Sequence, residues 1–212
     1  MQLMRRDLLK GLVCLPAAAF LRISPANAAG QFVGQVITRW SDDGRAMILT
    51  EPFEYVDANG KQWPVPKGTT VDGASIPRPF WSVIGGPFEG KYRNASVVHD
   101  FYCQVRTRPH LDVHNVFHEA MLTSGVPTRT GWLMFQAVNN FGPRWAEPKV
   151  DPKCEVVDDN YDFAACARNL RVPSLRRQEV SRGQIEDFIA EVEGEADPRD
   201  IRKLREGLDE MR

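Results

Sequence analysis

The sequence has no excess of charge of either sign, and no long hydrophobic run follows its first 29 residues. Lys and Arg number 27 and Asp and Glu number 28, so the formal net charge is −1. A nearly neutral chain offers little attraction to phosphates, and we therefore expect no nucleic-acid partner. A transmembrane helix needs roughly 20 consecutive apolar residues. We expect no transmembrane segment in the mature chain.

Residues 1–29 have the three-part build of an export signal. Arg5 and Arg6 precede the apolar run GLVCLPAAAFL, and SPANAA offers a cleavage site after Ala28 or Ala29. The run is too short to span a bilayer. The paired arginines are typical of a twin-arginine signal, which the export machinery reads and which does not anchor the protein. An ordinary secretory signal is the alternative. We expect the twin-arginine export machinery as a partner and a periplasmic or secreted location.

Cysteine is scarce after the predicted signal, where only Cys103, Cys154 and Cys166 remain. In an oxidising compartment, a Cys154–Cys166 disulfide would staple the polar stretch that contains both residues. Cys103 is then left over, and we expect it to be buried as a small hydrophobic residue.

Residues 31–71 are rich in branched and aromatic residues, which is typical of strands. Asn59–Gly60 is a hairpin turn signal. Pro64 and Pro66 cannot donate to a ladder, so the strand that carries them is expected at an edge. Together these features predict one small antiparallel sheet.

A helical period follows from residue 78 onward. It predicts helices over 92–105, 112–122 and 130–142, with Asp112 as the N-cap of the second. The third is apolar nearly all round and is expected to be the most buried. Two short charged helices follow within 174–212 and are expected to form a solvated tail.

The predicted fold class is therefore α+β: a small N-terminal antiparallel sheet, a three-helix core and a charged helical C-terminal tail. The predicted organisation is an export signal (1–29), a single α+β domain (30–147), and a polar segment with the helical tail (148–212).

All four histidines lie within residues 99–118, and histidine is the residue most used for base catalysis near neutral pH and for metal ligation. His114 and His118 are four residues apart on one predicted helix, so both could bind one zinc ion. Two histidines flanking the surface are the plainer interpretation of this pair.

His99 and Asp100 are adjacent, so on a helix they point about 100° apart. They cannot be a base and its own orienting carboxylate, but one can face a base site while the other faces a metal. Glycines at 85, 86 and 90 allow carbonyl groups to turn toward a cation. Asp72, Asp100 and the Gly86 carbonyl are candidate calcium ligands, since calcium prefers several oxygens. The alternative is that the glycines only shape a loop before the helix.

The segments VPKGTTVDGASIPRPFW, ASVVHDFYC and FHEAMLTSGVPTRTGWLMFQAV together resemble the bacterial and phage family called domain of unknown function 1353. The resemblance covers about residues 50–141. Tyr102 stands one place early relative to the family's His-Asp-x-x-Tyr pattern, and His114 stands where an aspartate is usual. The family has no settled activity, so the resemblance implies a fold neighbourhood and no particular reaction.

The chain is also similar to secreted prokaryotic phospholipase A2 through DGAS at 72–75 and the His99-Asp100-Phe101 run. This likeness implies that His99 is a general base, that Asp72 and Asp100 hold calcium, and that His114 takes the place of an orienting aspartate. Tyr102 joins His99 and His114 as a catalytic candidate. The departures are Ala74 in place of a cysteine, no cysteine before the dyad, and the neutral His114.

Three functions stay open on the sequence. The preferred one is an exported, calcium-assisted hydrolase of an ester, such as a lipid ester, that uses the His-Asp dyad. The second is a non-catalytic structural or binding module in which the motif residues only hold the loop against the helix. The third is a zinc hydrolase that uses His114 and His118.

Overall fold

The computed structural model describes residues 30–44, 46–71, 76, 78–86, 89–145 and 180–210. The strands are β1 (Gln31–Val33), β2 (Thr38–Trp40), β3 (Met47–Leu49), β4 (Phe53–Val56), β5 (Gln62–Val65) and β6 (Thr70–Val71). The helices are η1 (Arg78–Phe80), α1 (Trp81–Ile84), α2 (Arg93–Val105), α3 (His110–Thr123), α4 (Thr128–Phe141), α6 (Arg182–Val192) and α7 (Pro198–Asp209). Strands come first and helices follow, which confirms the α+β class.

The strands form two small antiparallel sheets where one was expected, in the orders β1-β4-β5 and β2-β3-β6. Residues 31–40 and residues 47–56 each form two short strands with an interruption between them. Gly34, with a φ of 81°, separates β1 from β2, and Pro52, which has no N–H to donate, lies between β3 and β4. The two short strands of each segment therefore pair in different sheets.

The hairpin between β4 and β5 forms as predicted. Gly60 has a φ of 79°, which a residue without a Cβ adopts at little cost, and its N–H donates to Asp57 O. The register places Tyr55 opposite Trp63. Pro64 lies in β5, an edge strand of its sheet, as its missing donor requires.

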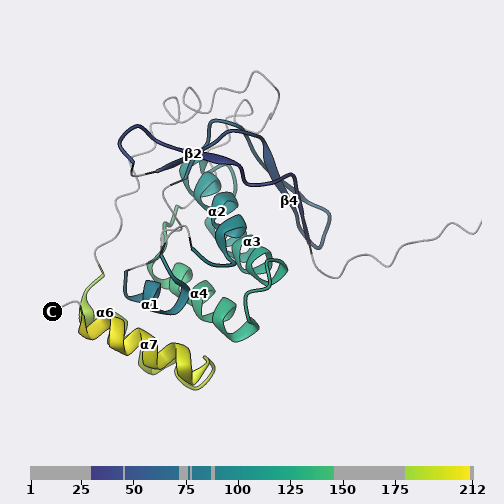
Figure 1. Ribbon diagram of the computed structural model, residues 1–212. Coiled ribbons are helices and arrows are strands. Elements are labelled where there is room, and N and C mark those ends of the chain that lie inside the picture. The colour runs from purple at the N-terminus through teal and green to yellow at the C-terminus, as the bar shows by residue number, and fades with distance from the viewer. Residues whose placement is uncertain are drawn as a thin grey trace, which may run out of the picture.

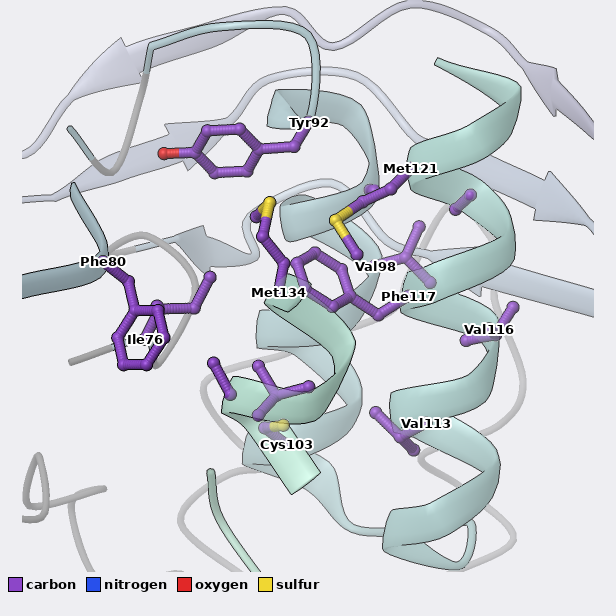
Figure 2. Close-up of a cluster of buried hydrophobic side chains, with 14 of the residues drawn as sticks. Ile76, Phe80, Tyr92, Val98, Cys103, Val113, Val116, Phe117, Met121 and Met134 are labelled. Atoms are coloured by element: carbon purple, nitrogen blue, oxygen red, sulfur yellow. The ribbon is translucent and has the colours of Figure 1, made fainter. Parts of the chain in front are cut away.

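Helices α2, α3 and α4 form the three-helix core. Helix α2 contacts α3 on one side and β5 and β6 on another, and α3 contacts α4. Figure 2 shows side chains from these helices, including Cys103, Phe117 and Met134, meeting in one apolar cluster. Figure 1 shows the strands on one side of α2 and α3, with α6 and α7 on the far side beyond α1 and α4.

Two expectations about these helices are wrong. Helix α3 begins at His110 with Pro109 as its N-cap, so Asp112 lies in the first turn, where its charge still favours the helix dipole. The most buried helix is α2, with ten buried residues against five in α4. Helix α2 is enclosed because sheets and helices pack on it from both sides.

The C-terminal helices pack on the core and do not form a solvated tail. The Phe188 ring of α6 contacts Phe80 and Phe141, with centroid distances of 5.4 Å to each. On α7, Asp200 accepts a hydrogen bond of 2.6 Å from Thr130 Oγ1. The few apolar residues of these helices are therefore a docking face, and most of their charged residues lie on the outer surface, with Asp200 as a buried exception.

The predicted export signal and the Cys154–Cys166 disulfide fall outside the described residues and stay predictions. Within the described part of the chain, no helix combines the length and apolar character needed to cross a membrane.

Candidate functional site

Helix α2 carries His99, Asp100 and Cys103 into the interior of the protein. Their exposed fractions are 0%, 2% and 0%. Burying a polar side chain this deeply costs free energy unless the group forms a hydrogen bond or ion pair, takes its uncharged form, or binds a metal. The interaction partners of these three residues therefore indicate what the site can do.

The His99 ring lies between α2 and α3. Its centroid is 4.6 Å from that of Phe117 and 5.4 Å from that of His114. Cys103, one helical turn further along α2, places its Sγ 3.6 Å from His99 Nε2. Burial, and to a lesser degree the proximity of His114, holds the pKa of His99 well below its usual value. At neutral pH the imidazole is uncharged and carries a lone pair.

His114 comes from α3 and is fully buried. Its Nδ1 is 3.0 Å from Asn139 Oδ1 of α4. Burial lowers the pKa of His114 to about 4, helped by electrostatic interaction with His110 and Arg144 and opposed by the Asn139 bond and the Pro143 carbonyl.

The second ring nitrogen of His114, Nε2, is buried and makes no hydrogen bond. Leaving a polar atom in this state costs roughly 1–3 kcal/mol. His99 and His114 are thus two neutral imidazoles in contact, and one of them has an unsatisfied nitrogen.

His99, Cys103 and His114 form a cluster of side chains that can ligate a metal. One ligand atom from each lies within 4.8 Å of the others, and all three residues are buried. Among the residues that the structure describes, this is the one group of three or more His, Cys, Asp and Glu side chains with such proximity. We call it the His–Cys–His cluster.

Asp100 faces a different neighbour from His99. Its charge, after burial and the charge of Glu89, contributes to raising the pKa of Tyr92 to about 12. The Tyr92 hydroxyl donates to the carbonyl oxygen of Gly86. Two of the predicted calcium ligands, Asp100 and Gly86, therefore lie near the same tyrosine. The third, Asp72, is outside the described residues.

The remaining predicted site residues have other surroundings. The Tyr102 hydroxyl donates to Pro64 O over 3.2 Å, and its ring packs edge-on against Trp63. The His118 ring stacks on Phe135 at 5.0 Å, and burial lowers the pKa of His118. His118 does not belong to the His–Cys–His cluster.

Sequence reasoning missed two residues of this site. Cys103 was assigned to packing, although it follows His99 by four residues and four-residue spacing places two side chains on one helix face. Asn139 gave no signal, because it meets His114 only through the packing of α4 on α3.

Together, these features define an α+β protein with a cluster of metal-ligating side chains in its helical core. Residues 47–138 match the family described as "Protein of unknown function (DUF1353)". This match confirms the resemblance drawn from the sequence motifs.

Two curated relatives come from Sinorhizobium fredii (strain NBRC 101917 / NGR234). Uncharacterized protein y4jT is 43% identical over 66% of this chain and 40% of its own length. Uncharacterized protein y4iH is 41% identical over 53% of this chain and 47% of its own length. The chain thus spans less than half the length of each. No solved structure matches the chain. The comparisons do not support the likeness to phospholipase A2.

Proposed function

We propose that this chain is an exported, metal-assisted ester hydrolase whose reaction centre lies between α2 and α3. The observation that carries the proposal is the contact between His99 and His114, which different helices bring together in the interior. Both imidazoles are held neutral, since burial lowers the pKa of each. A neutral imidazole is the form that either accepts a proton or binds a metal ion.

The low pKa of His99 bears on its predicted role as general base. A base works best when its pKa lies near the working pH, and a strongly lowered pKa makes His99 a weak proton acceptor. Its lone pair suits a metal better. A zinc ion held there would supply a water with a pKa of about 7, which could act as a nucleophile without a strong base. In ester hydrolysis the water oxygen bonds to the carbonyl carbon, the bond to the alcohol oxygen breaks, and the water's proton passes to the alcohol.

The calcium-assisted version has one observation in its favour. The Asp100 charge and the Gly86 carbonyl both act on the Tyr92 hydroxyl, so a carboxylate and a backbone carbonyl lie in the same region. Oxygen ligands of these kinds suit calcium. In this version Asp100 and Gly86 would help to hold the ion, and the attacking water would lose its proton to His99 despite the lowered pKa of that imidazole.

The non-catalytic module also has an observation in its favour, namely the complete burial of His99 and His114. In such a module the two rings would serve the packing of α2 on α3.

The experiment that tests the hydrolase is an assay of short- and long-chain p-nitrophenyl esters with added zinc or calcium. His99→Asn is expected to lower kcat/KM by about 10²–10⁴-fold, the usual contribution of a general base or an equivalent group. His118→Asn is the matched control, since it removes a partly buried histidine that lies outside the cluster, and its activity should stay unchanged.

Calcium dependence separates the two versions. If calcium alone supports activity and Asp100→Asn abolishes it, the calcium version is correct. Absence of hydrolysis with either metal, in wild-type protein that is folded by circular dichroism, would leave the non-catalytic module.

A further inference from the structure

We infer that His99, Cys103 and His114 bind one transition-metal ion of the zinc class between α2 and α3. This goes beyond the proposed function, which names oxygen ligands for calcium but no ligand set for a transition metal. It rests on the proposed function in one respect only: the three side chains would leave one ligand position of the metal open, and the proposed function assigns that position to a water or a substrate. Binding by the cluster can be measured without any substrate.

The spacing of the three residues is the first support. His99 and Cys103 are at positions i and i+4 of α2, so both side chains lie on the face toward α3. His114 lies on the facing helix, and its ring contacts His99 at 5.4 Å between centroids. Two ligands from one helix and a third from its neighbour is an arrangement that rigid, packed helices hold in place.

The separations of the ligand atoms are the second support. Zinc–nitrogen bonds of about 2.0–2.1 Å and zinc–sulfur bonds of about 2.3 Å in a tetrahedron put ligand atoms about 3.3–3.6 Å apart. Cys103 Sγ and His99 Nε2 are 3.6 Å apart, and no separation within the cluster exceeds 4.8 Å. The largest separation allowed by this bound exceeds the tetrahedral value by only about 1 Å.

The surroundings of His114 are the third support. A metal-binding histidine usually hydrogen-bonds through its other ring nitrogen, which orients the ring and sets the tautomer. Asn139 Oδ1 can only accept, so the 3.0 Å contact places a proton on His114 Nδ1. The lone pair then resides on Nε2, which is the buried nitrogen that makes no hydrogen bond. A bound metal would satisfy it.

The donor set selects the class of metal. A thiolate and two imidazoles favour zinc and its neighbours over calcium and magnesium, which prefer oxygen ligands. Three protein ligands leave one tetrahedral position for a water or a substrate, as catalytic zinc sites do.

The test uses the full chain without a polyhistidine tag, expressed with added zinc and then stripped and titrated with Co²⁺. We expect one equivalent of zinc per chain by elemental analysis. Bound Co²⁺ should show a thiolate-to-metal charge-transfer band.

Cys103→Ser, which keeps the side-chain volume, should remove that band and the stoichiometric zinc. Asn139→Ala should weaken zinc binding about 10–100-fold, as loss of an orienting partner does. His118→Asn should bind as wild type.

Folded wild-type protein that holds no stoichiometric zinc and shows no cobalt band would overturn the inference, and the cluster would then be a packed Cys–His contact. Zinc that survives Cys103→Ser but disappears in His118→Asn would also overturn it. Zinc bound by the cluster without ester hydrolysis would refute only the proposed function. Hydrolysis that persists in metal-free protein would refute the metal-assisted part of the proposed function and would leave the metal site to be judged by the zinc and cobalt measurements.

Discussion

Adjacent residues on α2 serve different parts of the interior. His99 faces Phe117 and His114, whereas Asp100 acts on Tyr92, because neighbours on a helix point about 100° apart. His99 and Asp100 therefore interact with different neighbours and do not act together as one catalytic pair.

Tyr92 gives a pH-dependent prediction at this scale. Its pKa rises from 10.0 to about 12 on folding, chiefly through burial and then through the charges of Glu89 and Asp100. Below pH 10 both folded and unfolded chains keep the proton, so this contribution to stability is fully present. As the pH rises from about 10 to 12 the unfolded chain loses its proton first, and about 1–3 kcal/mol of stability is lost.

Urea unfolding at a series of pH values checks this. Tyr92→Phe should cost about 1 kcal/mol at neutral pH through the lost hydrogen bond to Gly86. It should also show a shallower decline above pH 10. Some decline will remain, since the pKa of Tyr55 is also raised by burial. Equal slopes in wild type and Tyr92→Phe would show that the two charges and burial do not act on Tyr92 as described.

At the scale of elements, the docking of α7 against α1 depends on a close approach at Gly207. A Cβ there would lie 2.7 Å from Ser82 Oγ and 2.9 Å from Ser82 Cβ. Ser82 Oγ in turn donates to Lys203 O of α7 over 2.8 Å. The absence of a side chain at one helix position thus lets the two helices meet.

Gly207→Ala is expected to destabilise the protein, against the usual effect of this substitution in a helix. Helix propensity favours Ala by roughly 1 kcal/mol. Overpacking against Ser82 typically costs 1–3 kcal/mol, so we expect a net loss of about 1 kcal/mol in the free energy of unfolding and faster proteolysis near α6 and α7.

The matched control is Gly183→Ala in α6, where a Cβ meets no atom within 4 Å. That variant should be as stable as wild type or slightly more stable. A stabilised Gly207→Ala protein would show that α7 is not held against α1 in solution.

At the scale of the whole molecule, the described chain is one packed unit, because a single apolar cluster includes residues from the strands, the core helices and the C-terminal helices. The chain spans less than half of each curated relative. Export from the cytoplasm, and its route, are predictions that rest on residues 1–29 alone.

Replacing Arg5 and Arg6 together with lysine tests that route. A twin-arginine signal is read through its arginine pair, so we expect the double variant to stay in the cytoplasm. An ordinary secretory signal needs only positive charge before its apolar run, and the same variant would then still be exported. Cell fractionation followed by immunoblotting distinguishes the outcomes. Replacing Lys10 with arginine is the control, because it leaves the pair intact.

Much of the fold was predictable because it depends on local properties. Asn59 and Gly60 determine a turn through backbone conformation, Pro64 determines an edge strand through its missing donor, and the helices follow from residue periodicity. The division into two sheets was not predicted, because pairing between strands depends on where Gly34 and Pro52 interrupt them.

Of the candidate site, the sequence identified His99 and His114 through the clustering of histidines. The sequence also contained the four-residue spacing of His99 and Cys103. It could not predict which element packs against the face of α2 that carries them. The importance of Asn139 follows only from the packing of α4 on α3.

The sequence by itself determined the order of strands and helices, the apolar face of each helix, and the export signal prediction, because these depend on neighbouring residues along the chain. Only the tertiary structure decided that α3 faces the His99 side of α2, that Asn139 orients His114, and that the C-terminal helices dock on the core. The physical reason is that residue periodicity indicates which side of a helix is buried. The partner of that side is chosen by how all the elements pack together.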